Sequence, residues 1–225
     1  MAITVLQAQN NRQAASNAVT VTISTTLGSA LVAWSRQGLN NTNTVTMSDS
    51  SGTGTWVQTA SGYVSGDNST NRHAMWYKAN SDAVTSVTCT WTAGSQPTEL
   101  VVLELSDVHL ATPHDASVNS QAPATTSLTT GNLTTTVNDT ILIAGWGAGA
   151  DQTWGGNPAG YTFPTNGSTV RVYVAYKVVS AIQSAVNVTQ TDSASASMAS
   201  VFVALAEVIP GGPLQPSSPY LRMIH

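Results

Sequence analysis

The chain has 225 residues, of which only 7 are Lys or Arg and 11 are Asp or Glu, so 8% are charged against about 25% in an average domain. A net charge of -4 with so few basic residues excludes a nucleic-acid partner, because phosphate neutralisation needs clustered Lys and Arg. The apolar runs are far shorter than the roughly 20 residues that cross a bilayer, so no membrane partner is expected either.

The hydrophobic pattern predicts an all-β chain. Runs of β-branched and aromatic residues are interrupted about every 8 to 12 positions by Gly, Asn, Asp, Ser or Pro, and no segment has a convincing helical period. The glycine-rich segments 50–54 and 145–160 are typical of turns and loops. The expected strands are 4–8, 18–23, 30–36, 44–49, 55–60, 73–79, 84–91, 99–105, 126–130, 140–147, 170–179, 184–191 and 198–208.

One strand-turn-strand pattern occurs twice. Tyr77 and Lys78 in the first copy match Tyr176 and Lys177, 99 residues further along the chain. Similar segments precede and follow both copies in the same order, which indicates an internal repeat. We therefore expect two similar β-units that pack face to face, each covering the apolar side of the other.

This repeat leads to a specific domain organisation. Two pseudo-repeats, at about 18–108 and 125–208, are expected to form one jelly-roll-like β-sandwich over residues 1–209. Residues 210–225 should form an extended, proline-rich C-terminal arm, because Pro and Gly at the start of this segment end the last strand. An apolar cluster near its end is expected to bind a neighbouring subunit or a partner shell. Its members are Tyr220, Leu221, Met223 and Ile224.

The segments "SDSSGTGTW" (48–56) and "MWYKAN" (75–80) resemble a β-sandwich module of bacterial surface proteins and of structural proteins of tailed bacteriophages. The resemblance implies a non-enzymatic virion structural protein, a capsid decoration or tail accessory subunit, with further copies of itself and a major capsid or tail protein as partners. The start of the chain does not resemble a signal peptide, so synthesis in the host cytoplasm is expected. A surface scarce in Lys, Glu and Asp also suits a subunit packed among others.

Two other functions remain open. The first is a carbohydrate-binding or adhesive module of a bacterial surface or secreted protein, which would bind a host-surface glycan. Six tryptophans are present, and exposed indole rings stack on sugars. Trp34, Trp76 and Trp91 lie in expected strands and should be core residues, whereas Trp154 lies in a glycine-rich loop. Trp154 is therefore the candidate for a glycan contact.

The second open function is a glycoside hydrolase, which uses a pair of carboxylates. Glu104 and Glu207 lie near the ends of matched strands, where carboxylates normally reach solvent, and we expect neither to be catalytic. Asp107, His109, His114 and Asp115 offer metal-ligand chemistry, but their spacing fits no zinc pattern. These four residues are expected to belong to a polar loop.

The remaining candidates are cofactors, calcium and the cysteine. No cofactor is predicted. Calcium binding at 47–52 or 65–69 is left open, because each loop offers one carboxylate among other oxygen ligands. Cys89 is the single cysteine and is expected to act as a small buried hydrophobic residue.

Overall fold

The computed structural model describes residues 2–38, 43–65, 71–94 and 96–208. Within these ranges the chain is all-β, as predicted, and every pairing between named strands is antiparallel. The strands are β1 (Thr4–Ser16), β2 (Ala18–Thr22), β3 (Ala30–Gly38), β4 (Val45–Asp49), β5 (Val57–Ser65), β6 (Asn71–Lys78), β7 (Ser86–Trp91), β8 (Gln96–Ser106), β9 (His114–Thr129), β10 (Thr140–Ala148), β11 (Val172–Val179) and β12 (Thr189–Ala206).

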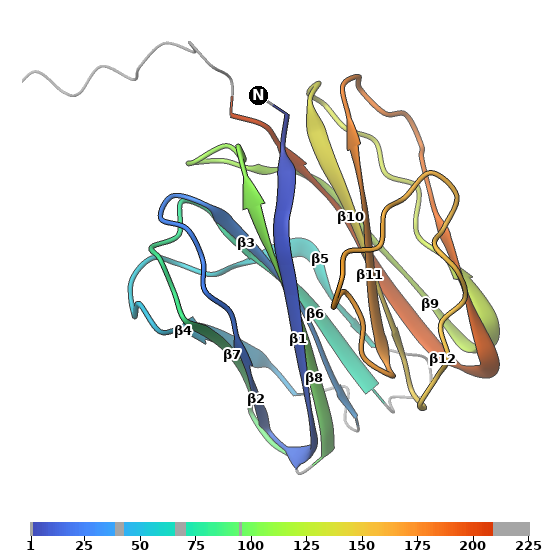
Figure 1. The fold of residues 1–225 in the computed structure, drawn as a ribbon. Helices are drawn as coiled ribbons and strands as arrows, with labels where there is room; N and C mark the ends of the chain where they lie inside the picture. Colours follow the sequence, from blue (N-terminus) through green and yellow to red (C-terminus); the bar gives the residue numbers. More distant parts are fainter. Residues whose placement is uncertain (1, 39–42, 66–70, 95, 209–225) are drawn as a thin grey trace, which may run out of the picture.

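Two sheets pack face to face (Figure 1). One has the strand order β1-β8-β3-β6-β5 and the other has β11-β10-β12-β9. Val32, Trp34 and Leu103 of the first sheet share a buried apolar cluster with Ile143 and Val203 of the second. The predicted β-sandwich is therefore confirmed.

A third sheet, with the order β2-β7-β4, covers the other face of the five-stranded sheet. Leu31 and Ala33 of β3 and Leu100 and Val102 of β8 point to this third sheet, where Cys89 of β7 is also buried. Burial raises the pKa of the Cys89 thiol to about 12, so the cysteine is the buried hydrophobic residue that was predicted. Both faces of β3 and β8 are covered, which explains their nearly continuous apolar sequences.

The strand pairing confirms two similar units. The order β1-β8-β3-β6 corresponds to β9-β12-β10-β11. Tyr77 lies opposite Val32 in the first set, and Tyr176 lies opposite Ile143 in the second. Both tyrosines pack against the cluster between the large sheets, so they occupy corresponding positions. The correspondence includes β1 and β9, which begin before the expected repeat starts at 18 and 125. We refer to residues 2–108 as the first unit and to residues 109–208 as the second unit.

The second unit has one isolated bridge where the first unit has its third sheet. Its isolated bridge between Leu133 and Val186 matches the pairing of Val21 with Val87 in the first unit. The outer face of its sheet carries a separate apolar cluster, against which Trp154, Tyr161 and Phe163 of the loop 149–171 pack. Each unit therefore has a core of its own in addition to the core that the two units share.

Three strands are much longer than their apolar pattern indicates. β1 continues from the expected 4–8 to Ser16. The expected strand 126–130 is the end of β9, which begins at His114, where a polar loop was predicted. The expected strands 184–191 and 198–208 contribute to one strand, β12, whose register shifts between Thr191 and Met198. β9 lies at the edge of its sheet, so its polar residues can pair through the backbone without supplying an apolar pattern.

Glycines of β10 allow the two units to approach closely. Gly145 and Gly147 fall both in the expected strand 140–147 and in the glycine-rich segment 145–160; both lie in the strand, and neither has a positive φ. A Cβ atom on Gly145 would lie 2.7 Å from the Trp34 ring, and one on Gly147 would overlap the His73 ring. Trp34 also donates a hydrogen bond from Nε1 to the Trp146 carbonyl at 3.0 Å. The first unit thus fits into notches in the second.

The predicted arm, 210–225, lies outside the described residues. In the part of the chain that the structure covers, there is no helix long and apolar enough to cross a membrane.

Candidate functional site

The His and Asp residues of segment 107–115 have separate structural roles. His109 accepts a hydrogen bond through Nδ1 from the Thr112 backbone N–H at 3.0 Å, which closes a turn. The carboxylate of Asp115 accepts one from the Thr136 backbone N–H at 2.9 Å. Among the described residues, no group of three or more His, Cys, Asp or Glu side chains is placed to hold a metal ion.

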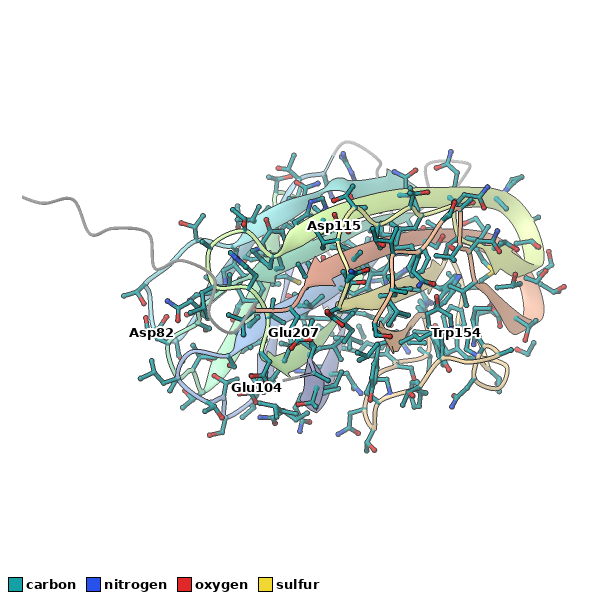
Figure 2. The ribbon with its side chains drawn as sticks, turned by 90° about the horizontal axis from the view of Figure 1, so that it is seen from above. Asp82, Glu104, Asp115, Trp154 and Glu207 are labelled. Atoms are coloured by element: carbon teal, nitrogen blue, oxygen red, sulfur yellow. The ribbon has the colours of Figure 1, made fainter. Side chains whose placement is uncertain are left out.

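Glu104 does not reach solvent, which contradicts the prediction. Its side chain is buried, and its carboxylate accepts hydrogen bonds from Gln7 Nε2 and from the Thr26 backbone N–H, both at 2.6 Å. The strand register aligns Glu104 with Ala204 rather than with Glu207. Glu207 follows the end of β12. The two glutamates, labelled in Figure 2, are therefore not an equivalent pair.

A buried ion pair joins the two segments on which the sequence resemblance rests. Lys78 Nζ lies 2.7 Å from Asp49 Oδ2, and both side chains are at most 2% exposed. Lys78 also donates to the Thr53 carbonyl at 2.6 Å and to Ser51 Oγ at 3.2 Å. Trp56 Nε1 donates to the same Asp49 oxygen at 2.8 Å. Asp49 is thus occupied, so this loop does not offer a free carboxylate for calcium.

The environment of Asp49 favours its charged form. Burial alone would raise the pKa of this carboxyl group, but hydrogen bonds from Lys78, Ser51 and Trp56 hold the pKa below its usual value. Gly54, with φ +69, passes so close to Lys78 that a Cβ atom would lie 2.8 Å from Cε. The other loop in which calcium was considered, 65–69, lies mostly outside the described residues.

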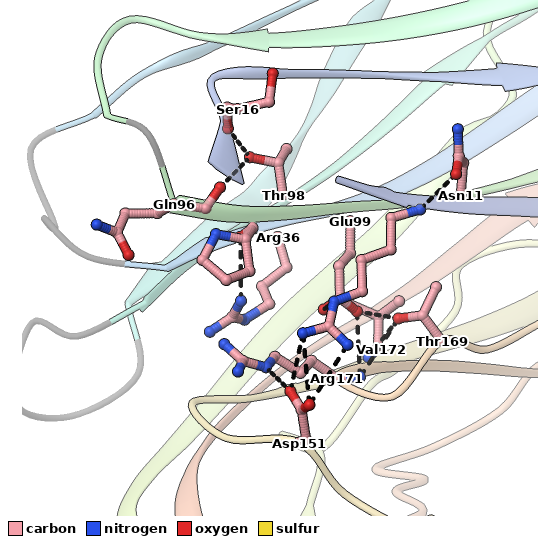
Figure 3. Close-up of polar contacts among 12 residues, drawn as sticks. Asn11, Ser16, Arg36, Gln96, Thr98, Glu99, Asp151, Thr169, Arg171 and Val172 are labelled. Carbon is pink, nitrogen blue, oxygen red and sulfur yellow. Dashed lines mark hydrogen bonds and ion pairs between the residues drawn. The ribbon is translucent and has the colours of Figure 1, made fainter. Parts of the chain in front are cut away.

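A second polar group lies between the two units (Figure 3). Arg36 and Glu99 are both fully buried, and burial lowers the pKa of Arg36 to about 9 although Glu99 acts to raise it. Arg12 Nε lies 3.4 Å from Glu99 Oε1. From the second unit, the Thr169 hydroxyl and the Arg171 backbone N–H donate to Glu99 Oε2. This group joins the two units through polar contacts.

His73 extends this inter-unit polar group. The ring is fully buried and stacks on Trp34, with centroids 5.4 Å apart. Its Nε2 is 2.5 Å from Asn71 Oδ1, and Asn71 Nδ2 donates to Ser197 Oγ of the second unit at 2.7 Å. Burial, and secondarily the charge of Arg36, hold the pKa of His73 well below its usual 6.5. His73 is therefore neutral in the folded protein at pH 7.

Mild acid is expected to destabilise the fold through His73. A lowered pKa in the folded state means that the unfolded chain binds the proton more readily. The stability that the neutral ring contributes is complete above about pH 6.5 and is lost as the pH falls towards the folded value. We expect the free energy of unfolding to drop by about 1–2 kcal/mol between pH 7 and pH 5.

Denaturant titrations at the two pH values would measure this drop. His73→Gln, which does not titrate in this range, should reduce the pH dependence. His114 contributes in the same direction, because burial lowers its pKa more than Asp115 raises it, so the His114→Gln variant serves as a comparison. An unchanged pH dependence in His73→Gln would contradict the prediction.

The loop 149–171 contains a hollow of about 500 Å³, which we call the Trp154 hollow. Trp154 lies beside Tyr173, with ring centroids 5.8 Å apart, and donates from Nε1 to the Thr169 carbonyl at 3.0 Å. In Figure 2, Trp154 and Asp82 lie at opposite ends of the molecule. The position is consistent with a ligand contact, and the glycan contact stays a prediction. The sequence analysis missed Gln152, which also lines this hollow.

Other hollows lie elsewhere on the surface of the described residues, and two of them contain residues named above. One, of about 410 Å³, is lined by Trp56 and Trp76 beside β4. Trp76 is therefore only partly buried, unlike the fully buried Trp34 and Trp91, because β4 ends the third sheet before it covers this part of β6. The other, of about 570 Å³, includes Glu207.

The predicted partner-binding residues all lie outside the described residues. They are Tyr220, Leu221, Met223 and Ile224. For the chain as a whole, no family model matches, and neither a curated protein nor a solved structure matches it.

Proposed function

We propose that this chain is a non-enzymatic structural subunit of a bacteriophage virion, a capsid decoration or tail accessory protein. The observation that carries the proposal is the burial of charge in a chain that has little of it. Arg36, Lys78, Glu99 and Glu104 are at most 1% exposed. The surface is therefore even poorer in charge than the composition indicates.

A surface of this kind favours association. Protein interfaces are depleted in Lys, Glu and Asp, and a surface with few charges repels identical neighbours weakly. The two units share one apolar core and therefore present a single body for such packing. The resemblance of segments 48–56 and 75–80 to phage structural modules directs the proposal towards a virion. Because Asp49 and Lys78 join these segments in a buried ion pair, the resemblance concerns the framework of the sandwich rather than a catalytic site.

The proposal predicts a defined assembly. Light scattering after size exclusion should give a mass that is a fixed multiple of the 23.3 kDa chain, and negative-stain images should show rings or decorated particles when shell protein is supplied. A monomer at all concentrations that also fails to bind shell protein would overturn the proposal. Turnover of a glycoside by the purified protein would equally overturn it.

Deleting residues 213–225 is expected to weaken assembly with little change in thermal stability. The segment begins at Pro213, and its apolar cluster is proposed to bind a neighbouring subunit or the shell. Thermal unfolding and mass measurements on the truncated chain would check this. The matched control replaces Tyr220, Leu221 and Ile224 by Ser in the full-length chain and should reproduce the loss of assembly. A truncated protein that melts much earlier but assembles normally would contradict the prediction.

A further inference from the structure

The loop that carries the Trp154 hollow is specific to the second unit. Between corresponding strands, the first unit has residues 39–70, with β4 and β5, whereas the second has the loop 149–171. In the first unit the third sheet covers the outer face of the large sheet, whereas in the second unit this loop packs on that face and leaves Trp154 and Phe163 only partly buried. Binding residues are commonly placed on loops that a rigid scaffold positions.

Three aromatic rings line the hollow. Phe163 stacks on Tyr173 with centroids 4.9 Å apart, and Trp154 lies at an angle on Tyr173. Tyr173 is 3% exposed, and its hydroxyl donates to Asn157 Oδ1 at 3.0 Å, whereas Trp154 and Phe163 are only partly buried. The partly exposed rings provide apolar surface for the C–H face of a sugar ring.

Gln152 is the polar residue that most clearly indicates a ligand in this hollow. It lines the hollow and is 9% exposed, yet neither Nε2 nor Oε1 has a hydrogen-bond partner among the described residues. Its backbone N–H donates to the Val170 carbonyl at 2.8 Å, which fixes the position of the residue. An unpaired buried polar group costs about 1–3 kcal/mol. A buried amide with both groups unpaired thus points to a ligand that supplies both a donor and an acceptor.

The other lining residues define the chemistry of that ligand. No charged side chain belongs to the hollow, whose polar members carry hydroxyl or amide groups. They are Gln152, Thr153, Asn157, Ser168 and Thr169. Neighbouring hydroxyls of a sugar both donate and accept, and a site without basic residues gives no preference for an anionic sugar or a phosphate.

We propose that the Trp154 hollow binds a neutral saccharide. One face of the sugar ring packs on Trp154, and two adjacent hydroxyls bond with the amide of Gln152. The hollow beside Trp56 and Trp76 is a weaker candidate, because its Trp56 indole N–H already donates a hydrogen bond to the Asp49 carboxylate and is not free for a ligand. This site adds a recognition function to the proposed structural subunit and does not depend on that assignment.

Saturation-transfer NMR with neutral trisaccharides of glucose, galactose, mannose and N-acetylglucosamine tests the proposal on the full-length chain. Sialyllactose is the charged comparison. We expect at least one neutral trisaccharide to bind and sialyllactose to give no additional affinity. Gln152→Leu should weaken binding at least about tenfold, equivalent to about 1.4 kcal/mol, while its melting temperature stays the same or rises, because a buried unpaired amide is removed.

Two further variants locate the site. Trp154→Phe should also weaken binding, because a smaller ring covers less of the sugar, whereas Trp76→Phe in the other hollow should leave binding unchanged. Absence of binding by every trisaccharide would overturn the proposal. Binding that survives in both Gln152→Leu and Trp154→Phe would place the sugar elsewhere and would overturn it as well.

Discussion

Replacing Gly147 by alanine is expected to lower the free energy of unfolding by about 3 kcal/mol, at the upper end of the range for overpacked cores. The added Cβ atom would overlap the His73 ring. That ring cannot move easily, because it is fully buried, stacks on Trp34 and forms a hydrogen bond with Asn71. Relief therefore requires the two large sheets to separate. Urea titration of the variant and the parent at pH 7 would measure the change.

Gly156→Ala is the matched control. No atom lies within 4 Å of the Cβ position at Gly156, and its φ is not in the left-handed region, so we expect a change of at most about 0.5 kcal/mol. The double variant Gly147→Ala/His73→Ala should lose less stability than the sum of the two single variants, because the clash between the added Cβ atom and the His73 ring is then removed. Equal stability of Gly147→Ala and Gly156→Ala would show that the units do not interlock at this position.

Lys78→Met is expected to destabilise the fold by about 3–5 kcal/mol at pH 7, the usual cost of removing one partner from a buried ion pair. The Asp49 carboxylate would remain buried without its cation. Lys177 occupies the corresponding position in the second unit but is exposed, with Nζ 6.0 Å from the centre of the Tyr161 ring. Lys177→Met should therefore change stability by less than about 1 kcal/mol. Denaturant unfolding of both variants would measure the contrast.

The pH dependence of Lys78→Met provides a second test. In the parent protein the pKa of Asp49 is lowered, so its contribution is complete above the unfolded value of about 3.9 and is lost as the pH falls through the folded value. In the variant the unpaired Asp49 carboxyl can take up a proton. The difference in free energy of unfolding between the variant and the parent should therefore become smaller as the pH is lowered towards 4. Similar losses in Lys78→Met and Lys177→Met would contradict the importance of the buried pair.

The fold was predictable where apolar residues dominate the pattern. The repeat of Tyr77 at Tyr176 identified matched strands because each tyrosine packs on the same shared core. β9 was mostly missed because an edge strand can pair through its backbone with polar side chains outward. Gly145 and Gly147 fell in both an expected strand and a glycine-rich segment typical of loops, because glycine in a sequence gives the same signal for a turn and for close packing of two sheets.

The chemistry was less predictable than the fold. Glu104 lies near the end of a strand but is buried by Gln7 and Thr26, which are distant in sequence. Trp154 could be selected because it lies in a glycine-rich loop. Gln152 could not, since the lack of a partner for its amide is a property of the folded loop and leaves no mark in the sequence.

The interlock between the units also bears on how the chain is made. The notches that receive Trp34 and His73 are formed by Gly145 and Gly147, and β12 supplies part of the same cover still later in the chain. At a synthesis rate of about 5–20 residues per second, the first unit is made several seconds before the second unit, and the apolar face of its five-stranded sheet stays exposed during that time. Until the second unit is made, only a neighbouring nascent chain or a chaperone can cover this face.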